Sequence, residues 1–247
     1  DVCSAVQHAH QKGIIHRDIK PSNILVTLND GVPLPKIIDF GIAKAIDHRL
    51  TDKTLFTRFE QFVGTPAYMS PEQAEMSAMG VDTRTDIYSL GVLLYELLTG
   101  GPPFEAKQLL EAGYEEMRRR IREDEPVRPS TRLNTLGNKA LSTVANARRE
   151  EPGKLSRLLR GELDWIILKT LEKDRGRRYE TANALRADVE RYLKDEAVSA
   201  VAPSRVYRAG KLYRKHKGAI LSVAAVLAVL VGALAFSTVA YFGEREA

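Results

Sequence analysis

Four short groups of polar residues follow one another early in the chain, at spacings that could serve chemistry. They are His16-Arg17-Asp18-Ile19-Lys20-Pro21-Ser22-Asn23, Asp39-Phe40-Gly41, Gly64-Thr65-Pro66 and Ser70-Pro71-Glu72. Carboxylate and amide oxygens are hard ligands for divalent metal ions, and such ions bridge and neutralise phosphate oxygens. Taken singly, Asp18 and Asp39 could equally be carboxylates that form turns. The ordered set is what favours a chemical role.

In this order, the four groups resemble the motifs of the protein kinase superfamily, and within it the eukaryotic-like Ser/Thr kinases of bacteria. The pattern H-R-D-x-x-x-x-N is matched at every specified position, and Asp39 lies sixteen residues after Asn23. The resemblance covers residues 1–197 and implies a mainly α fold with a small β-hairpin. This fold corresponds to the larger, C-terminal lobe of a kinase domain.

The resemblance implies transfer of the ATP γ-phosphoryl group to Ser or Thr hydroxyls of protein substrates, and it assigns roles residue by residue. Asp18 is expected to act as the catalytic base, which accepts or orients the hydroxyl proton. Lys20 is expected to bind ATP and to neutralise the transferred phosphoryl group. Asn23 and Asp39 are expected to hold Mg²⁺ or Mn²⁺ beside the nucleotide. Thr65 is expected to hydrogen-bond near Asp18 and Lys20.

Other residues are assigned structural support by the same resemblance. Asp86 is expected to accept hydrogen bonds from backbone N–H groups of the catalytic loop, which we define as residues 16–23. Glu72 and Arg178 are expected to form a buried ion pair, whose disruption would cost several kcal/mol. His16 is expected to be a packed scaffold residue rather than an acid–base group.

Arg17, directly before Asp18, predicts regulation by phosphorylation. A buried cation at this position calls for an anionic partner, which a phosphorylated loop would supply. The candidate phosphosites are Thr51, Thr54 and Thr57, within the polar activation segment of residues 39–72. Each of them could instead be an ordinary loop threonine. Autophosphorylation between two molecules would require self-association.

The elements that position these residues can be predicted from periodicity. Residues 1–12 have the apolar spacing of a helix, and their His8 and His10 are too close in sequence to share a face and bind a metal. Residues 24–28 and 36–38 are predicted as the strands of a hairpin with an extended turn. Further helices are predicted at residues 86–98, 104–124, 161–173 and 180–194.

Two features depart from the family pattern. The sequence contains no G-x-G-x-x-G, no strand with an A-x-K lysine and no helix with its partner glutamate. The smaller N-terminal lobe is therefore predicted to be absent, with the natural N-terminus upstream of Asp1, and this chain alone is expected to have little or no kinase activity. Residues 125–160 are predicted to be a partly ordered insertion. Its basic side chains either dock a partner or solvate the loop: Arg128, Arg132, Lys139, Arg148 and Arg149.

The C-terminal part of the chain has the composition of a membrane anchor. Residues 218–243 contain no charged side chain and are long enough to span a bilayer as one helix. A buried helix of a soluble domain is the disfavoured alternative, because the segment is apolar on every face. Residues 198–217 are predicted to be a linker and a basic juxtamembrane segment, which suits anionic lipid better than nucleic acid. The positive-inside rule places residues 1–217 in the cytoplasm, at the inner membrane, and residues 244–247 on the far side.

Composition agrees with this division. The chain has 247 residues, of which 44% are hydrophobic and 28% charged, which excludes a wholly disordered protein. The single cysteine, Cys3, excludes a disulfide framework and a multi-cysteine zinc site. Of the 37 Lys and Arg and the 32 Asp and Glu, six bases lie at residues 205–217, and one base and two acids lie in the tail. Residues 1–204 are therefore neutral overall, and the net charge of +5 belongs to the membrane junction.

Three functions follow from these features. The favoured one is a membrane-anchored Ser/Thr protein kinase, represented here by a fragment. The second is a catalytically inactive, kinase-like scaffold tethered to the membrane. A scaffold would not need Asp18, Lys20, Asn23 and Asp39 together, and the chain has all four. The third is a membrane sensor with a kinase output, which would depend on sequence beyond residue 247.

Overall fold

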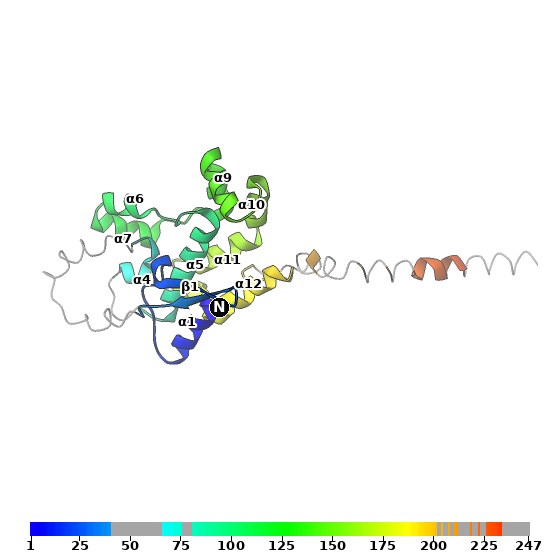
Figure 1. Cartoon of the computed structure of the whole chain (residues 1–247), viewed down its shortest axis with the longest axis horizontal. Helices are drawn as coiled ribbons and strands as arrows, with labels where there is room; N and C mark the ends of the chain where they lie inside the picture. Colours follow the sequence, from blue (N-terminus) through cyan, green and yellow to red (C-terminus); the bar gives the residue numbers. More distant parts are fainter. Residues whose placement is uncertain are drawn as a thin grey trace, which may run out of the picture. The chain divides into compact units, whose positions relative to one another are not determined.

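One long helix, α5, lies in the middle of the helical part of the structure (Figure 1). It spans Thr83–Thr99, and most of its residues are buried because few of them are charged. The helix begins at Asp82, whose side chain accepts a hydrogen bond from the Arg84 N–H at 2.8 Å. It ends at Gly100, where a φ of +87° suits glycine.

The computed structural model describes residues 1–40, 66–75 and 81–201, together with residues 204, 207, 210, 211, 218, 222 and 226–233. It divides into two units, Asp1–Glu190 and Arg191–Ala247. The helices and strands, in chain order, are α1 (Val2–Gln11), η1 (Pro21–Asn23), β1 (Ile24–Asn29), β2 (Val32–Ile37), η3 (Pro66–Tyr68), α4 (Pro71–Ala74), α5, α6 (Ala106–Glu111), α7 (Tyr114–Glu123), α8 (Pro129–Thr135), α9 (Asn138–Ala147), α10 (Pro152–Leu159), α11 (Glu162–Thr170), η4 (Arg175–Arg177) and α12 (Ala182–Leu193). The prediction of a mainly helical fold with one small hairpin is confirmed.

The core of the first unit forms where other elements pack against α5. Helix α11 approaches α5 so closely at Gly91 that a Cβ there would lie 2.6 Å from the Cβ of Thr170. One buried cluster joins these two helices to η3, and it consists of Ala67, Tyr68, Tyr88, Val92, Tyr95, Ile167 and Leu171. A second cluster joins α4, α6 and α7, through Ala74, Leu109, Met117 and Ile121. Both clusters bury residues that follow the activation segment or end it, so the core fixes that end of the segment.

The hairpin of β1 and β2 is antiparallel, with Ile24 opposite Ile37 and Asn29 opposite Val32. Its turn is the two residues Asp30 and Gly31, both at positive φ, and is therefore shorter than the extended turn that we predicted. Two prolines that were expected in the turn belong to β2 instead. The register allows this because Pro33 and Pro35 alternate with the residues that hydrogen-bond to β1.

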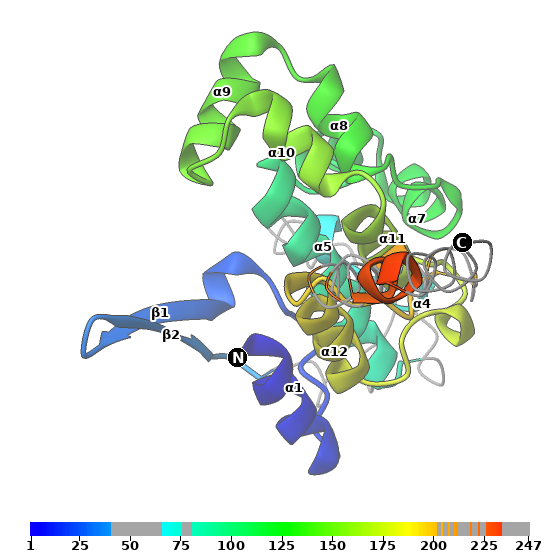
Figure 2. The ribbon, with the colours of Figure 1, turned by 90° about the vertical axis from the view of Figure 1, so that its right-hand side faces the viewer.

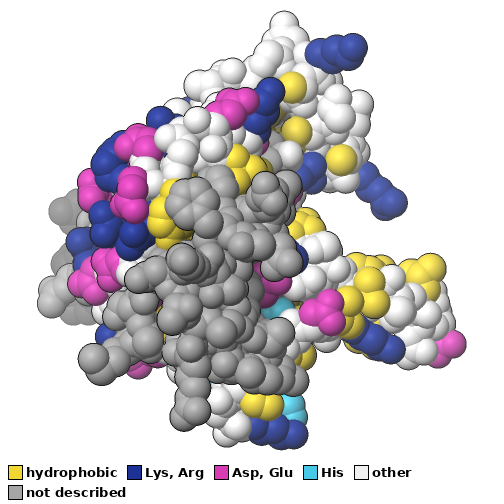
Figure 3. Space-filling model, turned by 90° about the vertical axis from the view of Figure 1, so that its left-hand side faces the viewer, with side chains coloured by type: hydrophobic (Ala, Val, Ile, Leu, Met, Phe, Trp, Pro, Cys, Tyr) yellow, Lys and Arg dark blue, Asp and Glu magenta, His cyan; other side chains and the backbone are white. Residues whose placement is uncertain are grey.

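The hairpin projects from the helices and carries exposed apolar side chains (Figures 2 and 3). Val26, Leu28 and Val32 are each more than 60% exposed. Because Val32 pairs with Asn29, it lies on the opposite face of the sheet from Val26 and Leu28. Apolar side chains are therefore exposed on both faces of the hairpin.

Two sequence predictions about the helices were wrong. Residues 104–124 are not one helix, because the chain turns at Gly113, with a φ of +86°, between α6 and α7. Residues 125–160 are not a partly ordered loop but three helices, α8, α9 and α10, grouped together in Figure 2. These three helices are short and rich in polar residues, so their apolar spacing is weak. They bury Leu133, Ala145, Leu155 and Leu159.

The second unit begins within α12, at Arg191. Its described residues include an ion pair between Lys211 and Asp195, with Nζ and Oδ1 2.6 Å apart. Of the predicted membrane segment, residues 218, 222 and 226–233 are described. No helix among the described residues is both long enough and apolar enough to cross a bilayer.

Candidate active site

The candidate site is built on one fully buried carboxylate, Asp86, in the first turn of α5. Its Oδ2 accepts hydrogen bonds from the His16 backbone N–H at 2.8 Å and from His10 Nε2 at 2.7 Å. Its Oδ1 accepts from the Arg17 backbone N–H at 2.8 Å. Three donors compensate the cost of burying the charge. The arrangement ties the start of the catalytic loop to the core helix and to α1.

His16 links the catalytic loop to the end of the hairpin. The side chain is fully buried, and its Nε2 lies 3.0 Å from the Ile38 carbonyl oxygen. Its Nδ1 accepts from the Asp18 backbone N–H at 3.3 Å, and its ring packs against Phe40 with centroids 4.7 Å apart. Since Nδ1 accepts a hydrogen bond, Nε2 carries the ring proton and donates to the Ile38 carbonyl oxygen. With both ring nitrogens engaged, His16 has the geometry of a scaffold residue.

Asp18, Lys20 and Asn23 lie together at the end of the catalytic loop. Lys20 Nζ is 2.9 Å from Asp18 Oδ2. The Asn23 side-chain nitrogen donates to the Asp18 carbonyl oxygen at 2.8 Å and to its Oδ2 at 3.2 Å. Asp18 and Lys20 retain 16% and 21% side-chain exposure, so both remain accessible to a ligand.

The hairpin brings Asp39 to this group. Asn23 directly precedes β1, and Ile38 directly follows β2. The Ile38 N–H donates to the Asn23 carbonyl oxygen at 3.0 Å, which extends the register of the ladder by one pair. Asp39 therefore follows the residue paired with Asn23, and its exposed carboxylate stands at the same end of the hairpin.

The oxygen atoms of these residues suit a hard divalent cation. Asn23 uses its side-chain nitrogen for Asp18, which leaves its amide oxygen for a metal. Among the described residues, no three His, Cys, Asp or Glu side chains form a metal cage of their own. Mg²⁺ does not need one, because it keeps several waters and takes one or two protein ligands together with phosphate oxygens. Asn23 and Asp39 fit that requirement.

Two residues of the site have an unusual backbone. Arg17 has a φ of +64° and Asp39 has a φ of +56°. Both values lie in the left-handed region, which residues other than glycine seldom adopt. Such conformations cost about 1 kcal/mol or more each and persist only where neighbours fix them. Each lies beside residues held by long-range hydrogen bonds. The Arg17 side chain is half-buried.

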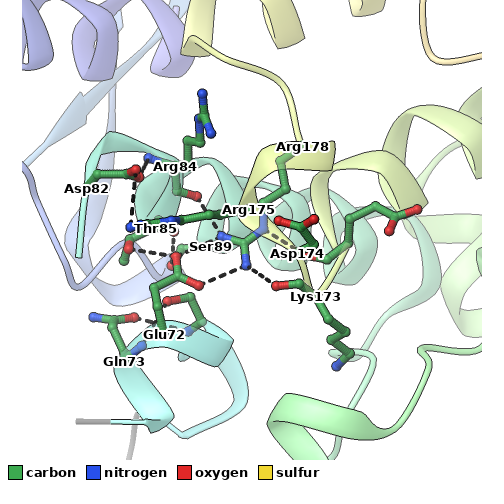
Figure 4. Close-up of polar contacts among 12 residues, drawn as sticks. Glu72, Gln73, Asp82, Arg84, Thr85, Ser89, Lys173, Asp174, Arg175 and Arg178 are labelled. Atoms are coloured by element: carbon green, nitrogen blue, oxygen red, sulfur yellow. Dashed lines mark hydrogen bonds and ion pairs between the residues drawn. The ribbon is translucent and has the colours of Figure 1, made fainter. Parts of the chain in front are cut away.

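Glu72 and Arg178 form a buried ion pair (Figure 4). The guanidinium donates to the two Glu72 carboxylate oxygens at 2.7 and 2.8 Å, and the Thr85 hydroxyl donates to the same carboxylate at 2.8 Å. Burial by itself raises the pKa of Glu72, but the hydrogen bonds and charge of Arg178 outweigh it and hold that pKa below its usual value. The pair connects α4, at the end of the activation segment, to the chain before α12.

Sequence reasoning missed His10 and Gln73. The spacing of His10 from His8 bears only on metal binding and gives no sign of its contact with Asp86. The Gln73 amide donates to the Arg17 carbonyl oxygen at 2.8 Å. The signal that could have identified Gln73 is the capping-box spacing Ser70-x-x-Gln73. Four predicted site residues lie outside the described part of the chain, namely Thr51, Thr54, Thr57 and Thr65, and so do the motif residues Gly41 and Gly64.

The Asp18 carboxylate, the Lys20 ammonium and the Asn23 amide thus lie together, at the same end of the hairpin as Asp39. Comparisons with known proteins show the family to which this chain belongs. A family model described as "Protein kinase domain" matches residues 1–189. The chain therefore belongs to the protein kinase family. It is 38% identical over 191 residues to the serine/threonine-protein kinase PknB of Mycobacterium leprae, and 37% identical over 200 residues to PknB of Mycobacterium tuberculosis.

These alignments cover 77% and 81% of this chain but 25% and 26% of the relatives. The chain thus spans about a quarter of the length of the curated relatives it matches. Among solved structures, the kinase domain of Mycobacterium tuberculosis PknI is 20% identical, with a TM-score of 0.46. That alignment covers 77% of this chain and 52% of the other.

Proposed function

We propose that residues 1–197 are the larger lobe of a Ser/Thr protein kinase that transfers the ATP γ-phosphoryl group to protein hydroxyls. The observation that carries this proposal is the contact of Asp18 with Lys20 and Asn23, beside Asp39 at the same end of the hairpin. A turn-forming carboxylate would not need a lysine at 2.9 Å and an amide at 3.2 Å.

Each residue of the group has a distinct task. Asp18 accepts or orients the proton of the substrate hydroxyl, and the Asn23 amide fixes the direction of its carboxylate. Lys20 neutralises charge on the phosphoryl group. The Asn23 amide oxygen and the Asp39 carboxylate hold Mg²⁺ or Mn²⁺, which supplies neutralisation of the ATP phosphates when bound. Thr65 is assigned a hydrogen bond near Asp18 by resemblance to the family.

Phosphotransfer to a Ser/Thr peptide library, by the protein purified from its own cells, tests this function. Asp18→Asn is expected to lower kcat by about 10²–10⁴-fold, because the general base is lost. Asp39→Asn is expected to raise the Mg²⁺ concentration needed for half-maximal rate. Asp30→Asn is the matched control, since Asp30 lies in the exposed hairpin turn, where asparagine is equally tolerated.

Full transfer by Asp18→Asn would refute the role of Asp18 as the general base. No transfer by the unsubstituted protein would favour a catalytically inactive, kinase-like scaffold. For residues 1–247 alone, which contain no Gly-rich loop, we propose little or no transfer.

We also propose that residues 218–243 anchor the protein in the inner membrane as a single helix, with residues 1–217 in the cytoplasm and residues 244–247 outside. The uncharged length of that segment and the six cations at residues 205–217 support this topology. The intact protein should stay in the membrane fraction after an alkaline carbonate wash. A protein truncated after residue 217 should not. Release of the intact protein by the wash would overturn the anchor.

Regulation by phosphate on the activation segment completes the proposal. Arg17 lies directly before Asp18 and carries a half-buried cation that a phosphate could pair with. Thr51, Thr54 and Thr57 are the proposed acceptors, phosphorylated by a second copy during transient self-association. Mass spectrometry of the active protein should find phosphate on at least one of the three. An active preparation with none would contradict this regulation.

A further inference from the structure

Gln73 occupies the third position of helix α4, where its side chain closes a capping box. The Gln73 backbone N–H donates to Ser70 Oγ at 3.4 Å, and the Ser70 backbone N–H donates to Gln73 Oε1 at 3.0 Å. The oxygen of the Gln73 amide is therefore used within its own helix. Its nitrogen is not needed there, since a glutamate serves equally well in a capping box.

The nitrogen of that amide donates instead to the carbonyl oxygen of Arg17, at 2.8 Å. This carbonyl belongs to the peptide bond that leads into Asp18. On its other side, Arg17 is held through its N–H by Asp86 at 2.8 Å. Arg17 thus has one backbone group fixed by α5 and the other by α4. Between them it keeps a φ of +64°, which a free chain would relax.

Helix α4 is itself held from the opposite side. Glu72 points toward Arg178, whereas the neighbouring Gln73 points away from it (Figure 4). The ion pair between Glu72 and Arg178 fixes the short helix to the core. A displacement of α4 would therefore withdraw the amide from Arg17, and the peptide before Asp18 would lose one of its two restraints.

We propose that Gln73 is a positioning residue for Asp18, which couples the end of the activation segment to the catalytic loop. The inference rests on the proposed kinase function. It goes beyond that function by assigning the orientation of the catalytic base to a side chain 55 positions away in the sequence. When α4 is in place, the Arg17–Asp18 peptide is fixed, and when α4 moves, the carboxylate of Asp18 loses its direction.

The variant Gln73→Glu separates the two roles of this side chain. The carboxylate still accepts from the Ser70 N–H, so the capping box remains, but at neutral pH it has no proton to donate to Arg17. In the intact protein, which is the one used to test the proposed function, we expect kcat to fall about tenfold or more with the KM for ATP within twofold, since small misplacements of a catalytic group are costly. The midpoint of thermal unfolding should stay within 2 °C or so of the unsubstituted protein, because the cap is kept.

Acidification provides a readout that a purely structural role would not move. Once protonated, the carboxyl group of the Gln73→Glu variant can donate to the Arg17 carbonyl, so the deficit in kcat should narrow as the pH falls from 8 toward 5. Ser70→Ala is the matched control, because it removes the cap but leaves the amide donor. It should lower the unfolding midpoint while kcat stays within about twofold.

Hydrogen–deuterium exchange of residues 1–247 tests the same contact without catalysis. Peptides covering residues 14–20 should exchange faster in Gln73→Glu than in Ser70→Ala. Unchanged kcat in Gln73→Glu, or a deficit that does not narrow on acidification, would overturn the positioning role. If Asp18→Asn is inactive while Gln73→Glu is fully active, only this inference fails. If Asp18→Asn is fully active, the proposed function fails with it.

Discussion

The sharpest stability prediction concerns Arg178→Met, which removes the cation from the buried pair with Glu72. The guanidinium donates five hydrogen bonds, two to Glu72 and one each to the carbonyl oxygens of Arg84, Glu172 and Lys173. Its side chain is fully buried, and that of Glu72 is 8% exposed. After the substitution, the carboxylate keeps the Thr85 hydroxyl but no compensating charge.

The expected cost follows from this burial. Removing one partner of a buried ion pair strands the other charge and typically costs about 3–5 kcal/mol. With an m-value of about 2–3 kcal/mol/M, the urea midpoint should fall by about 1–2 M. The double variant Glu72→Gln/Arg178→Met strands no charge, so it should be more stable than Arg178→Met alone. Urea titrations followed by Trp165 fluorescence, the single tryptophan of the chain, measure both.

Acid titration adds a second check. The pKa of Glu72 in the folded protein is held below its usual value. The pair's contribution to the free energy of unfolding is therefore complete above the pKa of the unfolded chain, about 4.3, and is lost as the pH falls through the pKa of the folded protein. Glu72→Gln should lack this part of the acid-dependent loss of stability. The reasoning would be refuted if Arg178→Met cost less than about 1 kcal/mol, or if the double variant were the less stable of the two.

Two further perturbations test the packing around this pair. Burial lowers the pKa of Lys173 to about 8. The unfolded chain therefore binds a proton more readily, and stability should rise between about pH 8 and pH 10. Lys173→Met removes the titrating ammonium, which lies over the Phe104 ring, and should flatten that rise in urea titrations across this range. Gly91→Ala should destabilise the protein by about 1–3 kcal/mol, because its Cβ would meet Thr170. Thermal unfolding of both variants measures this effect. The control Gly153→Ala lies in α10 with open space around the added Cβ, so it should be neutral or slightly stabilising. Equal destabilisation by the two substitutions would contradict the packing argument.

Local sequence signals predicted the elements well where the pattern was strong. The apolar run of α5 and the β-branched segments on either side of Asn29-Asp30-Gly31 gave a helix and a hairpin close to those observed. They failed at Gly113, where one glycine at positive φ divides a continuous amphipathic pattern. They failed again over residues 125–160, which form three short helices rich in polar residues. Such helices have only a few apolar residues each, so packing against neighbouring helices stabilises them more than any pattern in their own sequence.

The sequence by itself determined which chemical groups the protein has, their order along the chain and the uncharged C-terminal segment. The pairing of Asn23 with Ile38, which places Asp39 beside the catalytic loop, followed only from the observed two-residue turn at Asp30 and Gly31, because the turn sets the register of a hairpin. Only the tertiary structure decided what surrounds Arg17. The N–H of Arg17 meets Asp86, 69 positions away, and its carbonyl meets Gln73, 56 positions away. Such contacts depend on how α4 and α5 pack against the catalytic loop, from which they are distant in the sequence. The spacing of neighbouring residues along the chain does not predict that packing.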